Sequence, residues 1–182
     1  TVIDGTPFTV NYATTTAGLR QEVAEKISDS LADCGVQTVV QTLTPDELFA
    51  AGPGGIIFGR RFDLVQFSWQ INSSMPCNFY QGSRMPSADN NWLGVNVSGY
   101  ENVLFDNACQ AVQFMPLDRS GAAQQQVMSA QQLFAEELPA VPLYYRLHLA
   151  LSRPDICGII EDGSARTMLQ GLETLREAGE CP

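Results

Sequence analysis

The chain has 182 residues, of which 45% are hydrophobic and 16% are charged, and this balance excludes intrinsic disorder. Its 20 acidic residues against 10 basic ones give a formal net charge of −10, which repels phosphate backbones, so we expect no nucleic-acid partner. No apolar run approaches the roughly 20 residues that span a bilayer. We interpret the start at Thr1 as a processed end or a boundary, so the lack of a signal peptide does not argue for the cytoplasm.

The chain begins with the pattern of a strand, a helix and a second strand. Residues 8–13 alternate apolar and polar side chains, which predicts a strand. The hydroxyl residues 14–16 are expected to cap a helix whose apolar residues recur every four positions. Gly35 ends this helix, and the β-rich run 36–43 follows. This order predicts a right-handed parallel crossover unit.

A short helix and a third strand follow the crossover. Thr44 and Glu47 form a capping box with Pro45 at the first helical position, which predicts a helix through Phe49. The mostly apolar residues 62–69 predict a third strand, at the centre of the sheet.

The second half of the chain is predicted to be a long loop and two helices. Residues 70–100 are rich in Asn, Ser, Gly and Pro and form the loop. Helices are predicted over 103–114 and over 119–137. Strand material is predicted after them at 140–145 and 148–152, and a helix in the tail at 168–176. Together these elements predict one α/β domain with a mixed sheet.

The five cysteines are compatible with an oxidising compartment. Four of them lie in or beside loops and element ends, which predicts two disulfides; they are Cys77, Cys109, Cys157 and Cys181. Cys34 lies at the apolar end of the first helix and is predicted to be a buried thiol. The absence of a Cys-x-x-Cys pair and the single histidine argue against a structural zinc site, and no cofactor is expected.

Four stretches in chain order carry a resemblance to a known family. They are the helix end 31–36, the strand 62–69 with Pro76 after it, the helix opening 99–106 with Gly-Tyr-Glu-Asn, and the segment 130–144 with its Pro-Ala-Val-Pro-Leu-Tyr exit. Through these motifs the chain resembles the C-terminal lobe of the family 5 extracellular solute-binding proteins, the peptide, oligopeptide and nickel binders of ABC importers. The resemblance covers most of this chain but only part of the family's length.

The resemblance implies an α/β, mixed-sheet lobe of the type II periplasmic-binding-protein fold. It implies that residues 1–182 form a single lobe of a larger two-lobe protein whose N-terminal lobe is absent. The implied function is substrate binding for an ABC import system, with peptides or similar small polar solutes held in an inter-lobe cleft, and no enzymatic activity. The implied setting is extracytoplasmic, with a membrane permease as partner, a lipid anchor on the full-length protein and a monomeric state.

The predicted substrate-binding residues follow the third strand. Ligands of open α/β sheets lie outside the carboxyl ends of strands, which places Trp69, Gln70, Ile71 and Asn72 on the cleft face. In peptide-binding relatives an aspartate at the position of Asn72 anchors the ligand's α-amino group. The amide keeps hydrogen-bonding capacity without the charge, so we expect a peptide or another small polar solute. The alternative for Trp69 is a core tryptophan.

Two further expectations concern the long loop and the tail. The loop could set specificity through four residues, namely Tyr80, Asn90, Asn91 and Trp92, or it could be a surface loop with its own small core. A Cys77–Cys109 disulfide is expected to pin this loop to the following helix, and a Cys157–Cys181 disulfide to pin the tail.

Other functions fit the sequence less well. His148 lies in an apolar strand-like run and is interpreted as structural, and no Gly-x-Ser-x-Gly elbow is present. The adjacent Glu136 and Glu137 are interpreted as a solvated helix end. The second hypothesis is a ligand-sensing or interaction module on the same fold that is not coupled to transport, and a hydrolase ranks third.

Overall fold

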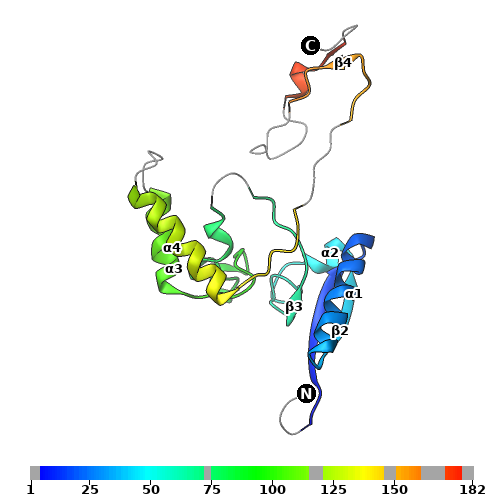
Figure 1. Ribbon diagram of the computed structural model, residues 1–182, viewed down its shortest axis with the longest axis vertical. Coiled ribbons are helices and arrows are strands. Elements are labelled where there is room, and N and C mark those ends of the chain that lie inside the picture. Colours follow the sequence, from blue (N-terminus) through cyan, green and yellow to red (C-terminus); the bar gives the residue numbers. More distant parts are fainter. Residues whose placement is uncertain (1–4, 72–74, 115–120, 146–150, 161–170, 178–182) are drawn as a thin grey trace. The chain divides into compact units, whose positions relative to one another are not determined.

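The computed structural model describes residues 5–71, 75–114, 121–145, 151–160 and 171–177 (Figure 1). The chain divides into two compact units. One unit comprises Thr1–Trp69 with Cys77–Ala140, and the other comprises Gln70–Pro76 with Val141–Pro182. The combination of helices with a parallel sheet confirms the predicted α/β class.

The predicted crossover unit is confirmed. Strand β1 (Phe8–Thr15), helix α1 (Gly18–Asp33) and strand β2 (Val36–Leu43) follow one another, and β1 pairs in parallel with β2 along its whole length. Figure 1 shows α1 lying along these two strands.

Two details at the ends of α1 differ from prediction. The threonines at 14 and 15 do not cap the helix but are buried residues of β1, and the N-cap is Ala17, which has no side chain that could accept a hydrogen bond. Cys34 is an exposed free thiol rather than a buried one, because the helix ends there and Gly35 turns the chain away with a φ of +80°.

Helix α2 (Pro45–Leu48) has the predicted capping box. The Glu47 backbone N–H donates to the Thr44 hydroxyl at 3.3 Å, and the Thr44 backbone N–H donates to the Glu47 carboxylate at 2.8 Å. These hydrogen bonds hold the pKa of Glu47 below its ordinary value. Leu48 points inward and is fully buried in the core of the first unit, with Ala13, Ile57 and Val97.

Strand β3 (Leu64–Val65) is much shorter than predicted and is not central. The order of the described strands is β2-β1-β3, so β1 lies in the middle. Just before β3, the Asp63 backbone N–H donates to the Asn11 carbonyl at 3.2 Å, but the return bond is made by a side chain. The Asp63 carboxylate accepts hydrogen bonds from the Asn11 backbone N–H (2.7 Å) and from its side chain (2.9 Å).

The long loop and the two helices complete the first unit. The loop contains three short 3-10 turns, at Cys77–Phe79, Gly82–Arg84 and Ala88–Asn90. Helices α3 (Val103–Phe114) and α4 (Gly121–Glu137) pack against each other. The predicted Cys77–Cys109 disulfide joins the first turn to α3.

The second unit has little regular structure among its described residues. Strands β4 (Ile156–Cys157) and β5 (Arg176–Glu177) form an antiparallel pair. Contrary to prediction, residues 141–145 and 151–152 form no strand, and the rest of the predicted strand 148–152 lies outside the described residues. The predicted tail helix is also wrong, because a 3-10 turn at Leu172–Thr174 leads into β5. Cys157 is in a disulfide, and its predicted partner Cys181 lies outside the described residues.

Candidate functional site

The carboxyl ends of β1 and β3 meet at one edge of the parallel sheet. β1 pairs in parallel with β3 and runs on to Thr15, and α1 begins at Gly18 just after this edge. Since ligands of parallel α/β sheets bind outside the carboxyl ends of strands, this edge is where a binding site is expected.

A buried polar cluster lies at this edge. The Gln66 side chain, 6% exposed, accepts hydrogen bonds at Oε1 from the hydroxyls of Tyr12 (3.2 Å) and Thr14 (3.1 Å). Its amide nitrogen Nε2 is buried and has no hydrogen-bond partner among the described residues. An unpaired buried donor costs about 1–3 kcal/mol, so this nitrogen is an unfavourable feature that the rest of the unit must offset.

Arg20 brings a positive charge to the same edge. Its Nη1 donates to the carbonyl oxygen of Gln66 at 3.2 Å, and its Nη2 donates to the hydroxyl of Ser68 at 3.0 Å. Within the part of the chain that the structure describes, no carboxylate forms a salt bridge with Arg20. A cation in the first turn of a helix is unfavourable, because the amino end of the helix dipole is positive. Arg20 therefore offers an uncompensated charge to an anionic group.

Aromatic side chains alternate with polar ones along residues 66–69, just after β3, and they belong to an aromatic cluster. Trp69 stacks on Phe79 with 4.9 Å between ring centroids and 3° between ring planes. It meets Phe67 edge-on at 5.1 Å and Phe49 at 6.4 Å. The cluster packs against the core of the first unit, and the Trp69 side chain is half-buried.

The four predicted substrate-binding residues do not all belong to the same unit of the structure. Trp69 belongs to the first unit, where its aromatic contacts support the alternative of a core residue while part of the side chain stays exposed. Gln70 and Ile71 belong to the second unit and are exposed. Asn72 lies outside the described residues. The common cleft surface of these four residues therefore stays a prediction.

The four loop residues predicted to set specificity make structural contacts. Tyr80 packs edge-on against α4, and Asn90 hydrogen-bonds within its own turn, accepting from one backbone N–H and donating to one carbonyl. Trp92 lies over Gly52 so closely that a Cβ on this glycine would overlap the indole. Asn91 takes the left-handed backbone conformation that ends a turn. These contacts support the alternative of a packed surface loop.

Sequence reasoning missed the polar cluster, although two signals for it were present. Gln66 is the one long polar side chain inside the apolar run 64–67. Arg20 is a cation near the start of a helix, where cations are disfavoured. Neither signal indicates the partner residues, because Tyr12 and Thr14 meet Gln66 only through the pairing of β1 with β3.

The candidates for catalysis gain no support. Glu136 accepts a hydrogen bond from its own helix, and Glu137 accepts one from Asn102 at 2.8 Å, so both carboxylates have structural partners. His148 lies outside the described residues. Among the residues that are described, no group of three or more His, Cys, Asp or Glu side chains could hold a metal ion, and no helix is long and apolar enough to span a membrane.

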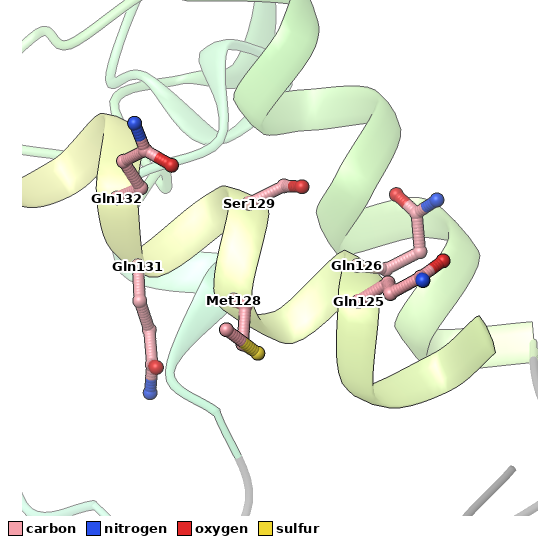
Figure 2. A pocket seen from close by; sticks show the side chains of 6 residues that line it. All are labelled: Gln125, Gln126, Met128, Ser129, Gln131 and Gln132. Carbon is pink, nitrogen blue, oxygen red and sulfur yellow. The ribbon is translucent and has the colours of Figure 1, made fainter. Parts of the chain in front are cut away.

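A shallow hollow along α4 is a surface feature rather than a binding site. Figure 2 shows the six side chains that line it, all from this one helix: Gln125, Gln126, Met128, Ser129, Gln131 and Gln132. Since a single helix cannot enclose a ligand, we place the candidate site at the sheet edge instead.

Comparison with known structures identifies the architecture. The chain is similar to the oligopeptide-binding protein from Thermus thermophilus complexed with a pentapeptide, with a TM-score of 0.72 and 23% identity over 86% of this chain and 28% of that chain. The oligopeptide-binding protein AppA from Bacillus subtilis, in complex with a nonapeptide, gives a TM-score of 0.59 and 18% identity over 75% and 25%. NikZ from Campylobacter jejuni, in complex with Ni(L-His), gives 0.57 and 14% over 72% and 25%.

These likenesses confirm the predicted fold, a lobe of the periplasmic-binding-protein type. The chain spans about a quarter of the length of these binding proteins. No model of a protein family and no curated protein matches the sequence.

Proposed function

We propose that this chain is one lobe of a two-lobed solute-binding protein that delivers peptides or similar small polar solutes to the permease of an ABC importer. The fold it shares with proteins that hold peptides or a nickel complex supports this role. Its ligand would lie between the lobes, and closure of the lobes on the ligand would signal occupancy to the permease. The protein would act as a monomer and without catalysis.

The observation that carries the proposal is the state of Arg20. Its guanidinium donates only to neutral acceptors among the described residues, and it lies at the sheet edge where ligands of this architecture bind. Charge-assisted hydrogen bonds are about twice as strong as neutral ones, so this guanidinium favours a ligand that carries a carboxylate. With the neutral Asn72 in place of an aspartate, the carboxylate of a peptide becomes its better anchor.

The proposed location is outside the cytoplasm, with a lipid anchor on the full-length protein. The buried Cys77–Cys109 disulfide supports an oxidising compartment, because disulfides are rare in reducing cytosol.

Native mass spectrometry of the two-lobed protein, purified without denaturation, tests the proposal, because a tightly bound solute is retained. We expect a bound mass that disappears on denaturation. A thermal-shift panel of tri- to pentapeptides, sugars and metal ions should then raise the melting temperature for peptides with a free carboxylate. If no solute is retained and no compound in the panel shifts melting, the binding function is refuted.

The matched variants are Arg20→Gln and Arg61→Gln. Arg61 also donates to a backbone carbonyl, that of Gly54 at 3.2 Å, but from an exposed loop. We expect Arg20→Gln to weaken binding of carboxylate peptides about tenfold and Arg61→Gln to leave it unchanged. If the two variants change peptide affinity equally, Arg20 is not part of the binding site.

A further inference from the structure

The indole of Trp69 has one neighbour that fixes the plane of its ring. Phe79 lies parallel to it, with 3° between planes, whereas Phe67 and Phe49 meet it at 90° and 65°. Edge-on neighbours restrain the position of a ring, but a parallel ring in contact also blocks its tilt. The orientation of the exposed part of Trp69 therefore depends on where Phe79 lies.

Phe79 is itself held by a covalent restraint. It ends the 3-10 turn that begins at Cys77, and the disulfide from Cys77 to Cys109 ties this turn to α3. Both cysteines are buried, at 3% and 0% exposure. The backbone N–H groups of Tyr80 and Gln81 close the turn by donating to the Cys77 carbonyl at 3.0 and 3.1 Å.

We propose that Phe79 is a positioning residue for ligand binding: the disulfide-held turn sets the orientation of the Trp69 indole that forms a wall of the cleft. This inference rests on the proposed binding function and on the predicted place of Trp69 at the cleft. It assigns the disulfide a role in the shape of the site, because the covalent bond to α3 keeps the stacked ring from withdrawing.

The chain allows a direct optical test, because it contains only two tryptophans, Trp69 and Trp92. A Trp92→Phe background leaves Trp69 as the single indole of the 182-residue chain. In this background we expect Phe79→Leu to raise the acrylamide quenching constant of Trp69 about twofold and to weaken its near-UV dichroism, since the stacked face is uncovered. Phe79→Tyr keeps the ring and should restore both signals. Unchanged quenching in Phe79→Leu would overturn the proposal.

A matched control separates positioning from general loosening of the unit. Phe134 is also half-buried and packs edge-on against Tyr80, but it makes no ring contact with Trp69. Phe134→Leu should lower the melting temperature without changing the quenching of Trp69. If it changes quenching as much as Phe79→Leu does, the effect is not specific and the proposal fails. The double variant Cys77→Ala and Cys109→Ala should change the quenching of Trp69 in the same direction as Phe79→Leu, and unchanged quenching would show that the disulfide does not hold Phe79.

A binding measurement completes the test with trialanine, tetraalanine and pentaalanine as probes of the two-lobed protein. Phe79→Leu should weaken their binding about 2- to 13-fold, the range that corresponds to one aromatic pair, and Phe79→Tyr should restore it. If none of these peptides binds the unaltered protein, peptide binding is what fails, while the quenching comparison still decides whether Phe79 orients Trp69. Altered quenching with unaltered affinity would overturn the role of this orientation in binding.

Discussion

Removal of the Cys77–Cys109 disulfide should lower the free energy of unfolding by roughly 3–4 kcal/mol, if chain entropy of the unfolded state dominates. The disulfide joins residues separated by 32 positions. The entropy model gives about 3 kcal/mol for a 15-residue loop and about 4.7 kcal/mol for a 100-residue loop, and this loop falls between them. Both cysteines are buried, so serine in their place would leave hydroxyls in an apolar setting and add a loss unrelated to chain entropy.

The assay is urea denaturation followed by far-UV circular dichroism, with alanine at positions 77 and 109 to avoid buried hydroxyls. Substitution is preferable to a reducing agent, because Cys157 is also in a disulfide that a reductant would open. Cys34→Ala is the control, since this thiol is free and exposed, and it should leave the unfolding midpoint unchanged. A loss below about 1 kcal/mol in the double variant would refute the entropic reasoning for this loop.

Three further predictions concern stability. Glu47→Gln should lower the melting temperature at neutral pH, and this difference should vanish as pH falls from about 5 to 3. Hydrogen bonds from Thr44 lower the pKa of Glu47 in the folded state. The ionised carboxylate therefore stabilises the fold above the unfolded-state pKa, and this stabilisation is lost as pH falls through the folded-state pKa. Gly99→Ala should destabilise the chain by about 1–3 kcal/mol in urea, because φ is +70° there, a conformation that strains alanine, while the Arg60 side chain can move away from the added Cβ; a neutral result would contradict the strained backbone. Burial, together with the nearby Glu137 carboxylate, raises the pKa of Tyr100 to about 12, so stability should fall as pH rises from about 10 to 12, and Tyr100→Phe should flatten this decline in alkaline melting curves.

The sequence predicted the elements whose signals are local. The crossover of β1, α1 and β2 follows from hydrophobic periodicity and a glycine stop, and the capping box of α2 follows from the spacing of Thr44 and Glu47. The start of strand β3 was predicted wrongly, because the Asp63 carboxylate accepts the backbone N–H of Asn11, a residue far away in the sequence. The prediction of a tail helix was wrong because Gly171 adopts a φ of +84° at the start of a tight turn. Hydrophobic periodicity does not reveal such a turn.

The candidate site was predicted less completely than the fold. The family resemblance pointed to the end of the third strand, and Trp69 does lie there beside a packed aromatic cluster. The polar cluster needs the register that brings Tyr12 and Thr14 to Gln66, more than 50 positions later. A single sequence does not show this register, because the paired residues lie far apart along the chain.

The central position of β1 in the sheet predicts which part of the chain unfolds last and which part folds first. Its backbone pairs with β2 on one side along Phe8–Thr15 and with β3 on the other at two residues, Tyr12 and Ala13. Amide hydrogens flanked on both sides exchange with solvent only when the surrounding unit opens, so those of these two residues should be among the slowest to take up deuterium. Pairing of β1 with β2 also closes a shorter stretch of chain than pairing with β3, and the lower entropy cost favours the crossover as the part that forms first. The edge that holds Gln66 and Arg20 would then be completed only when the third strand arrives.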